Sequence, residues 1–491
     1  MNNAKGAWHA VFVQDQYTAG RMTLQGALRF DHSSSWYPEQ TEGPSKFLPQ
    51  AVTFPETKGV TGYKDITPRV GMAYDLFGNG RTAVKANVGK YLEGMGLSNN
   101  WANANPTNRV PLSPGVTIFG PAGVTRAWTD ANNNFTPDCN LQDPNLQDLR
   151  TSGGDFCAAL QNRAFGTPTL TNSFDPALLT GWGVRSSDWT FGASVQQQIS
   201  ARSSIEVAYT RRWYRGFTVT DNLATANSDW QQYSITAPSD PRLPGGGGYV
   251  VSGLYDLNPA LFGQVNNFVE LAEHHDLGEW KNNFNGVDVT LNVRLRNGWT
   301  FQGGTSTGQG SGNNCAVRAN LPELNANLIQ GLPGINTSVV NTTNPYCDVD
   351  YGWLTQMRAI SNYVIPKIDV QFSGVFQSKP GALLAANWAA PASVVGAALG
   401  HAPAGNVPNV TINLLPPGEM YGDRLNQLDF RVGKVLRFGR TRTLISADLY
   451  NSLNSSAVLT YNNTFVPGGT WLQPQTVITG RIIKFAAEIT F

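Results

Sequence analysis

Residues 304–308 read GTSTG and match the G-x-S-x-G pattern, which presents a nucleophilic serine in serine hydrolases. That chemistry needs a strand before the serine and a helix directly after it. A strand is predicted before this motif, but the glycine-rich residues 309–312 that follow are a poor start for a helix. We therefore interpret the motif as the end of a glycine-rich strand that enters a loop, and we predict no catalytic residue and no enzyme activity.

A second stretch combines carboxylates and imidazoles, which are suitable ligands for a transition metal. If residues 268–280 form a short helix, then Glu270, Glu273 and His274 share one face of it. A solvated helix explains the same charges, and we prefer that interpretation. The full set is Glu270, Glu273, His274, His275 and Asp276.

A third stretch has oxygen-bearing side chains at positions 1, 3, 5 and 9 of the calcium-loop pattern. Position 6 is Phe135 instead of glycine, and position 12 is Leu141 instead of glutamate. Two readings stay open, a loop that binds Ca²⁺ and a polar turn anchored by a disulfide. The four candidate calcium ligands are Asp130, Asn132, Asn134 and Asp138.

Four cysteines permit three disulfide connectivities. The local pairing joins Cys139 to Cys157 and Cys315 to Cys347, and each pair then lies within one long polar loop. If these loops are exported, we expect both disulfides; in a cytosolic protein the four residues would be free thiols.

The composition narrows the class of protein. The chain has 491 residues, of which only 14% are charged, and its glycine and aromatic contents are high. The formal net charge of +1 predicts no nucleic-acid partner. Membrane-spanning helices are excluded because no run of about 18 apolar residues exists. Residues 1–6 have no apolar stretch of the kind found in signal peptides.

Alternation of apolar and polar residues is the main structural signal. Its clearest example has Val287, Val289, Leu291 and other apolar residues on one side of a strand, with polar residues such as Asp288 between them. Similar strands pair through short turns along the whole chain, including a weaker pair around Pro238–Gly248. The last strand, 483–491, alternates in the same way and ends on an aromatic residue.

Turns of two to five residues alternate with long loops, and we place the longest at 92–187, 257–283, 308–353 and 379–409. This asymmetry is typical of transmembrane β-barrels, whose strands face lipid on one side and a wet lumen on the other. A β-sandwich would also point charges to solvent, but it accommodates several long loops at one end less readily. We predict an all-β, antiparallel transmembrane barrel over residues 1–491, with long extracellular loops.

We count roughly 15–17 strands, and the number must be odd because the first and last strands run the same way. Single-chain bacterial barrels are usually even. We therefore expect part of a larger barrel, with a gap or a strained seam between the first and last strands.

Several segments resemble one family of proteins. Residues 12–16 (FVQDQ) with 28–31 (LRFD), residues 67–78 (TPRVGMAYDLFG) and residues 448–454 (DLYNSLN) with Phe491 are similar to hairpins of TonB-dependent outer-membrane receptors. The most similar branch is the Oar-like one, which carries a carboxypeptidase-regulatory-like domain before the plug. The resemblance covers most strands and is weak in the loops.

The resemblance implies a location in the outer membrane and energised uptake of a bulky solute, which is either a small molecule or a polymer. The extracellular loops would bind the solute, and a TonB-type energy-coupling complex would act through a plug that has no counterpart in this sequence. Outer-membrane lipid would be the surrounding partner. Alternatives are a passive porin, a surface adhesion or matrix-interaction barrel, and a secreted soluble β-protein, although no repeat of 20 to 50 residues supports the last one.

Overall fold

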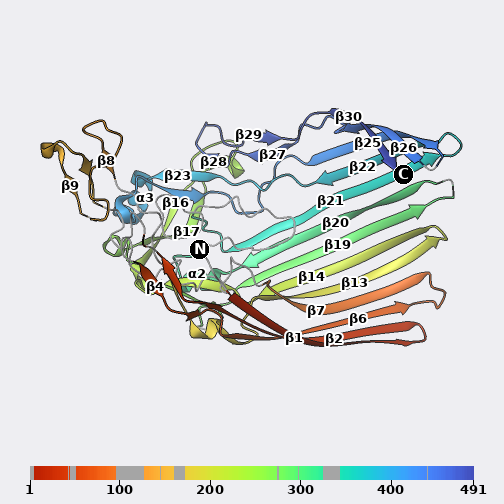
Figure 1. Cartoon of the computed structure of the whole chain (residues 1–491), viewed down its shortest axis with the longest axis horizontal. Helices are drawn as coiled ribbons and strands as arrows, with labels where there is room; N and C mark the ends of the chain where they lie inside the picture. Colours follow the sequence, from red (N-terminus) through yellow and green to blue (C-terminus); the bar gives the residue numbers. More distant parts are fainter. Residues whose placement is uncertain are drawn as a thin grey trace.

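The architecture is dominated by one large, strongly curved antiparallel sheet (Figure 1). The computed structural model describes residues 5–42, 44, 51–94, 127–143, 145–159, 172–273, 276–296, 298–324, 343–439 and 441–490. Within these ranges no helix is long and apolar enough to cross a membrane.

Thirteen strands of this sheet follow one another as an unbroken antiparallel path, which we call the wall. In path order they are β1 (Lys5–Ala19), β2 (Met22–Tyr37), β6 (Gly62–Asp75), β7 (Thr82–Leu92), β13 (Ser187–Ser200), β14 (Ser203–Arg215), β19 (Lys281–Arg294), β20 (Thr300–Asn313), β21 (Asp348–Ile365), β22 (Val370–Lys379), β25 (Leu425–Phe438), β26 (Thr441–Tyr450) and β30 (Ile482–Thr490). Two short strands, β5 (Thr57–Lys58) and β12 (Thr180–Trp182), extend the sheet beside β2 and β6 and bring it to fifteen.

Alternation along the strands gives the wall one apolar and one polar side. Val207 pairs with both Val195 and Val289, so these three side chains share a side. Val195 and Val207 remain 47% and 45% exposed, which is unusual for valines of a protein surrounded by water. The predicted strand that begins at Val287 is confirmed as part of β19 with Val287, Val289, Leu291 and Val293 on this side, but β19 ends at Arg294, one residue before the predicted end at Leu295.

Short turns join the strands at one end of the wall and long connections join them at the other (Figure 1). Gly20 and Gly439 adopt positive φ in two of the short turns, a conformation that glycine takes without steric cost. The long connections cover residues 38–61, 93–186, 216–280, 314–347, 380–424 and 451–481.

Small sheets and helices form within these connections. They comprise β3 (Gln40–Glu42) with β4 (Val52–Phe54); β8 (Trp128–Thr129), β9 (Gln147–Asp148) and β10 (Phe156–Cys157); β11 (Asn172–Phe174), β15 (Thr218–Asn222) and β18 (Asn267–Leu271); β16 (Trp230–Thr236) with β17 (Val250–Leu257); β23 (Asn387–Pro391), β24 (Asn409–Asn413) and β28 (Thr464–Phe465); β27 (Val458–Tyr461) with β29 (Pro474–Val477); the α-helices α2 (Cys315–Asn320) and α3 (Ala392–Leu399); and 3₁₀ turns at Arg150–Ser152, Pro176–Leu178, Asn227–Asp229, Pro244–Gly246, Pro259–Leu261 and Ala404–Asn406.

These elements differ from the sequence predictions in two ways. The strand pair around Pro238–Gly248 exists, but as β16 and β17 it forms a separate two-stranded sheet and adds nothing to the wall. Some connections also have other bounds: the segment predicted as loop 257–283 belongs to a connection that begins at 216, and β20 continues to Asn313 inside the predicted loop 308–353. The glycine- and serine-rich end of β20 has the composition of a loop, which explains the second difference.

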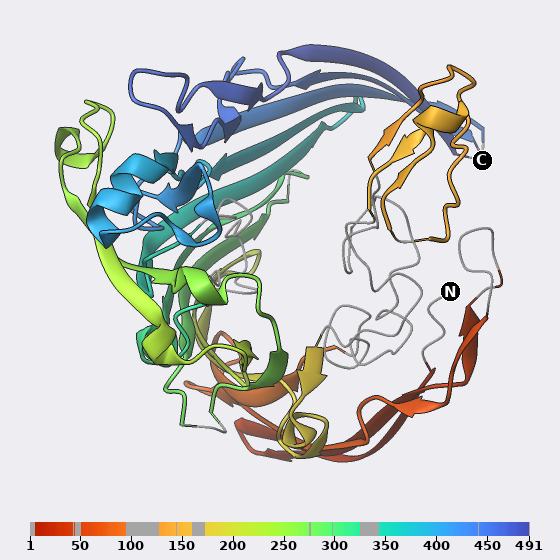
Figure 2. The ribbon, with the colours of Figure 1, turned by 90° about the vertical axis from the view of Figure 1, so that its left-hand side faces the viewer.

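The wall is open along one side (Figure 2). Among the described residues β1 and β30 are its two edges and do not pair with each other. Because thirteen strands alternate in direction, these two edge strands run the same way. The expected gap between the first and last strands is therefore present.

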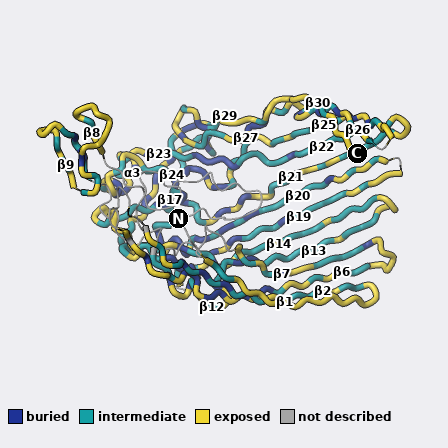
Figure 3. The backbone as a smooth tube through the Cα atoms, in the orientation of Figure 1, coloured by how far each residue is buried: buried dark blue, intermediate teal, exposed yellow. Residues whose placement is uncertain are grey.

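Fully buried residues concentrate at the long-loop end, whereas the wall is mostly intermediate or exposed (Figure 3). The largest buried cluster combines residues of β16, β17, α3 and β24 with Phe465 and Trp471. The hydrophobic core of this chain thus lies among its loops.

Candidate functional site: the loop cap and the polar side of the wall

Three long connections, 216–280, 380–424 and 451–481, share that largest core, and we call the unit they form the cap. Trp471 is 1% exposed and packs edge-on against Phe465, with ring centroids 5.0 Å apart. Its indole Nε1–H donates to the Ala385 carbonyl over 2.9 Å, so its only polar atom is satisfied. One side chain therefore joins two of the three connections.

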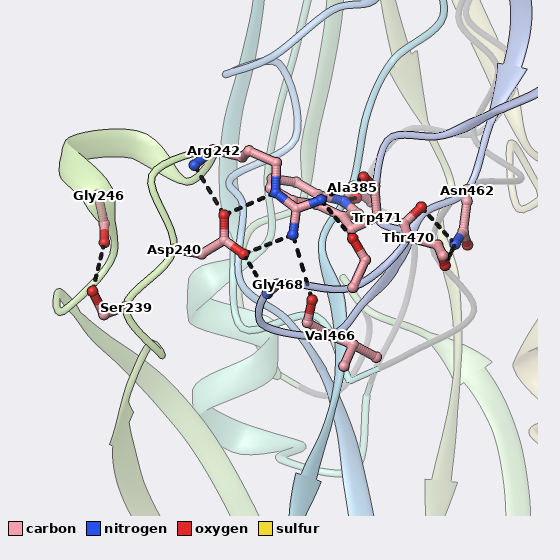
Figure 4. A network of polar contacts seen from close by, with 11 residues as sticks. Ser239, Asp240, Arg242, Gly246, Ala385, Asn462, Val466, Gly468, Thr470 and Trp471 are labelled. Carbon is pink, nitrogen blue, oxygen red and sulfur yellow. Dashed lines mark hydrogen bonds and ion pairs between the residues drawn. The ribbon is translucent and has the colours of Figure 1, made fainter.

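The remaining connection, 216–280, is tied to this core by an ion pair (Figure 4). Asp240, almost fully buried, accepts hydrogen bonds from Arg242 Nε and Nη2 at 2.9 and 2.7 Å. The guanidinium also donates to the carbonyls of Gly469 and Trp471 at 2.9 and 2.8 Å and lies over the Trp471 ring. Gly468 N–H donates to Asp240.

The polar groups of this cluster are electrostatically matched. Hydrogen bonds from Arg242 hold the pKa of Asp240 far below its usual range. Elsewhere in the cap, burial raises the pKa of Tyr233 to about 12. The hydroxyls of Tyr249 and Tyr346 both donate to the Leu414 carbonyl, at 2.9 and 2.7 Å. The cap is thus a pre-ordered surface at the mouth of the wall.

Sequence reasoning missed this cluster. The turn Pro238–Gly248 and the tryptophan at 471 were visible, but their separation of more than 220 residues gave no sign that they meet.

Below the cap, charged side chains on the polar side of the wall form cross-strand pairs. Between neighbouring strands, the shortest contact of Arg212 with Asp188 is 2.7 Å and that of Arg431 with Asp448 is 2.6 Å. Arg29 and Asp31, 2.8 Å apart, form a pair within β2. Lys85 lies 3.7 Å from Glu206, which also accepts from Ser194. This side is suited to water and polar solutes.

Two cavities, of about 590 and 520 Å³, lie along the polar side of β20. Ser306 and Arg358 line both of them, and Gly304 and Gly308 each line one. A side chain does not fit at either glycine without a shift of its neighbours: a Cβ at Gly304 would lie 2.1 Å from the Val289 carbonyl oxygen of β19, and one at Gly308 would lie 2.7 Å from the Phe284 ring. These cavities are candidate contact sites for a solute.

The GTSTG motif is part of this strand. Residues 304–308 lie in the middle of β20, which runs on to Asn313, so the prediction that a strand ends there was wrong. No helix follows the serine directly, since α2 begins only at Cys315. The geometry of a hydrolase nucleophile is not formed.

The possible helix 268–280 does not form in the described residues of that range. Residues 267–271 form strand β18, and Glu270 is buried on it while Glu273 is exposed beyond its end. His274 and His275 lie outside the described residues. Within the described part of the chain no cluster of three metal-ligating side chains forms. Asp276 is described, and it belongs to no such cluster.

The four candidate calcium ligands converge in a loop next to β8. Both carboxylate oxygens of Asp130 accept backbone N–H groups, from Asn134 and Phe135. Asp138 accepts from the amides of Asn132 and Asn134. Hydrogen bonds within the loop thus occupy these oxygens, as a polar turn requires, and a Ca²⁺ ion here stays a prediction.

Disulfides join Cys139 to Cys157 and Cys315 to Cys347. The first lies beside the carboxylate of Asp155, which accepts from Trp128 Nε1 at 2.9 Å and from Ala131 N at 3.0 Å. The second connects α2 to the residue that precedes β21. Each pair lies within one long connection, at the cap end of the wall.

A curved antiparallel wall with an apolar and a polar side defines a transmembrane β-barrel protein. The family model for the outer membrane beta barrel domain matches residues 1–304, more than half of the chain, so the chain belongs to this family. The protein is located in the outer membrane.

Solved structures of outer-membrane transporters are similar to this fold. The transporter YddB from Escherichia coli has a TM-score of 0.45 and 10% identity, and the match covers 99% of this chain and 54% of that one. The ferric-catecholate import receptor Fiu from E. coli K12 (TM-score 0.43, 11% identity) is covered to 44%, and the ferric citrate transporter FecA (0.40, 8%) to 45%, each matching 99% of this chain. The chain thus spans about half the length of these structures. No curated protein matches its sequence.

Proposed function

We propose that this chain is the barrel part of an outer-membrane receptor of the TonB-dependent, Oar-like type, which takes up a bulky solute with energy from the inner membrane. The cap binds the solute, and the polar side of the wall carries it past the cavities at β20. A plug domain, acted on by a TonB-type complex, gates the lumen. The observation that carries the proposal is the pre-ordered cap, because a passive pore has no need of a buried core at its mouth.

The test uses the full-length protein in its own outer membrane. Uptake of a labelled panel of ferric chelates, copper and oligosaccharides is measured with the energy-coupling complex present and deleted, and with Trp471→Ala in the cap. We expect at least one solute whose uptake is lost in both cases. Uptake that persists without energy coupling indicates a passive porin. Attachment to a surface or matrix that depends on Trp471, without any uptake, indicates an adhesion barrel.

A further inference from the structure

A cavity of about 730 Å³ lies at the turn end of the wall, on the side that faces the lumen, and we call it the turn-end cavity. The strands around it, β7, β13, β14 and β19, lie side by side (Figure 1). Gln196 lines the cavity and accepts a hydrogen bond from Lys85 at 2.7 Å, and Lys85 contacts Glu206 on the polar side. Short turns of outer-membrane barrels lie in the periplasm, so the cavity is at the periplasmic end of the lumen.

Three arginines line the turn-end cavity, and the strand register brings them together. The Arg294 N–H donates to the Arg202 carbonyl over 2.8 Å, so the backbones of these two residues are direct neighbours. The Gln198 N–H of β13 donates to the Arg81 carbonyl over 2.7 Å. Arg81 therefore lies two strand spacings, about 10 Å, from β14.

The positive charges of the turn-end cavity have no partner in the protein. Arg81, Arg202 and Arg294 are exposed, and none of them forms an ion pair with another described residue. Two carboxylates toward this end of the strands are engaged elsewhere. Glu206 pairs with Lys85, and both carboxylate oxygens of Asp75 accept backbone N–H groups of its own turn. Among the described residues that line the cavity there is no carboxylate.

This arrangement differs from the rest of the polar side. Arg212 has Asp188 as its partner there, and Arg431 has Asp448. Like charges on neighbouring strands are destabilising, and three of them meet at the turn-end cavity. A bound anion would relieve this repulsion.

The remaining lining is small and hydrophilic. Gln198, Ser204 and Asn292 form one row across β13, β14 and β19, because Ser204 pairs with both of the others. Among the described lining residues the only apolar side chains are the methyl groups of Ala83 and Ala201. A lipid or a folded protein surface would bring apolar groups that find no partner here. A hydrophilic anion, in contrast, finds hydrogen-bond donors on every strand of the cavity.

The turn that carries Arg202 is ordered before any ligand binds. Ser200 Oγ and Ser203 Oγ lie 2.7 Å apart, and the Arg202 N–H donates to Ser200 Oγ at 3.2 Å. Gln197 Nε2 donates to the Gln198 carbonyl at 2.8 Å. Because the backbone is held in this way, binding would have to order only side chains, which limits its entropic cost.

We propose that the turn-end cavity binds a hydrophilic solute that carries two or more phosphate or carboxylate groups. Arg202 and Arg294 hold one group, because guanidinium groups bind such oxyanions through paired hydrogen bonds. Arg81 holds a second group across β13, and the amides of Gln198 and Asn292 donate to oxygens between the two. At the periplasmic end of the lumen such a site receives the solute after its passage. That role rests on the transport proposed above, whereas the binding itself does not.

Isothermal titration calorimetry of the full-length protein in detergent, with defined anions, tests this assignment. We expect inorganic tripolyphosphate to bind at least tenfold more tightly than orthophosphate, because only the longer anion reaches both groups of arginines. Arg202→Gln with Arg294→Gln should weaken tripolyphosphate binding at least tenfold, and Arg81→Gln should reduce the preference over orthophosphate. Citrate in place of tripolyphosphate distinguishes the two chemistries: equal affinity identifies carboxylates as sufficient, and tenfold weaker binding identifies phosphates as the groups recognised.

Arg21→Gln is the matched control. It removes an exposed arginine from the turn between β1 and β2, at the same end of the wall but outside the cavity, and should change neither the affinity nor the preference. An equal loss of binding in this control would overturn the assignment, because it would show attraction by the general charge of the turns. Equal affinity for tripolyphosphate and orthophosphate, or no measurable binding by the full-length protein, would overturn it as well.

A heat-modifiability gel shows that each variant is folded. If Arg202→Gln with Arg294→Gln does not fold, the pair of lysine substitutions keeps the charge but not the paired hydrogen bonds. This pair should bind tripolyphosphate severalfold more weakly than the wild type, and unchanged binding would contradict the assignment. Since no uptake is measured, failure of the anion to bind leaves the test of energised uptake unaffected.

Discussion

Trp471 contacts all three connections of the cap through its ring, its indole N–H and its backbone carbonyl. Replacement by alanine would remove a fully buried ring and leave a cavity. We predict that Trp471→Ala lowers the stability of the cap by about 3–5 kcal/mol. Hydrogen exchange of the amides around Ala385 and Phe465 should accelerate, while that of β14 should not. Val466→Ala, at a 53% exposed neighbour, is the control and should have little effect.

The Asp240–Arg242 pair predicts a particular dependence on pH. The folded-state pKa of Asp240 is depressed below its unfolded value of about 3.9, so the pair contributes stability above that value. The contribution is lost as the pH falls through the folded-state pKa. We predict that Asp240→Asn destabilises the cap at pH 7, and that the difference from the wild type shrinks below about pH 3. Thermal unfolding followed by tryptophan fluorescence measures this difference; a gap that widens on acidification would contradict the role given to the pair.

At the scale of elements, the sequence predicted the wall well and the cap poorly. Alternation along β19 requires only neighbouring residues, and the two-residue turns that fix the register are also local. The cap depends instead on contacts between residues such as Asp240 and Gly468, far apart in the chain. The helix considered for 268–280 failed for a related reason, since pairing of β18 with β11 and β15 overrides local propensity.

The two sides of one strand should differ in their tolerance of charge. Val289 faces lipid near the middle of β19, and Thr290 faces the lumen and lines a cavity there. An arginine on the lipid side near the membrane midplane costs about 2–4 kcal/mol. We predict that Val289→Arg impairs assembly and that Thr290→Arg does not. Heat-modifiability gels of outer-membrane fractions compare the two; equal assembly would contradict the assigned sides.

At the scale of the whole molecule, the open side of the wall leaves the edge strands β1 and β30 without pairing partners among the described residues. Val11 and Val13 on β1 are 72% and 66% exposed, and Phe485 on β30 is 81% exposed. Unpaired backbone groups at a sheet edge in hydrocarbon cost several kcal/mol each. Two copies of the wall would not remove this cost by antiparallel pairing, because β1 of one copy and β30 of the other run the same way when both cross the membrane in the same sense.

An odd number of further antiparallel strands between β1 and β30 closes the wall with an even total and leaves no edge. We predict that another segment supplies them. The backbone amides of β1 and β30 should then exchange slowly in the full-length protein and quickly in the isolated chain, with β14 slow in both. A direct parallel seam is the competing arrangement. Tyr17→Cys with Ile489→Cys places thiols near the turn end of both edge strands, and their disulfide in high yield would show that β1 and β30 meet without intervening strands.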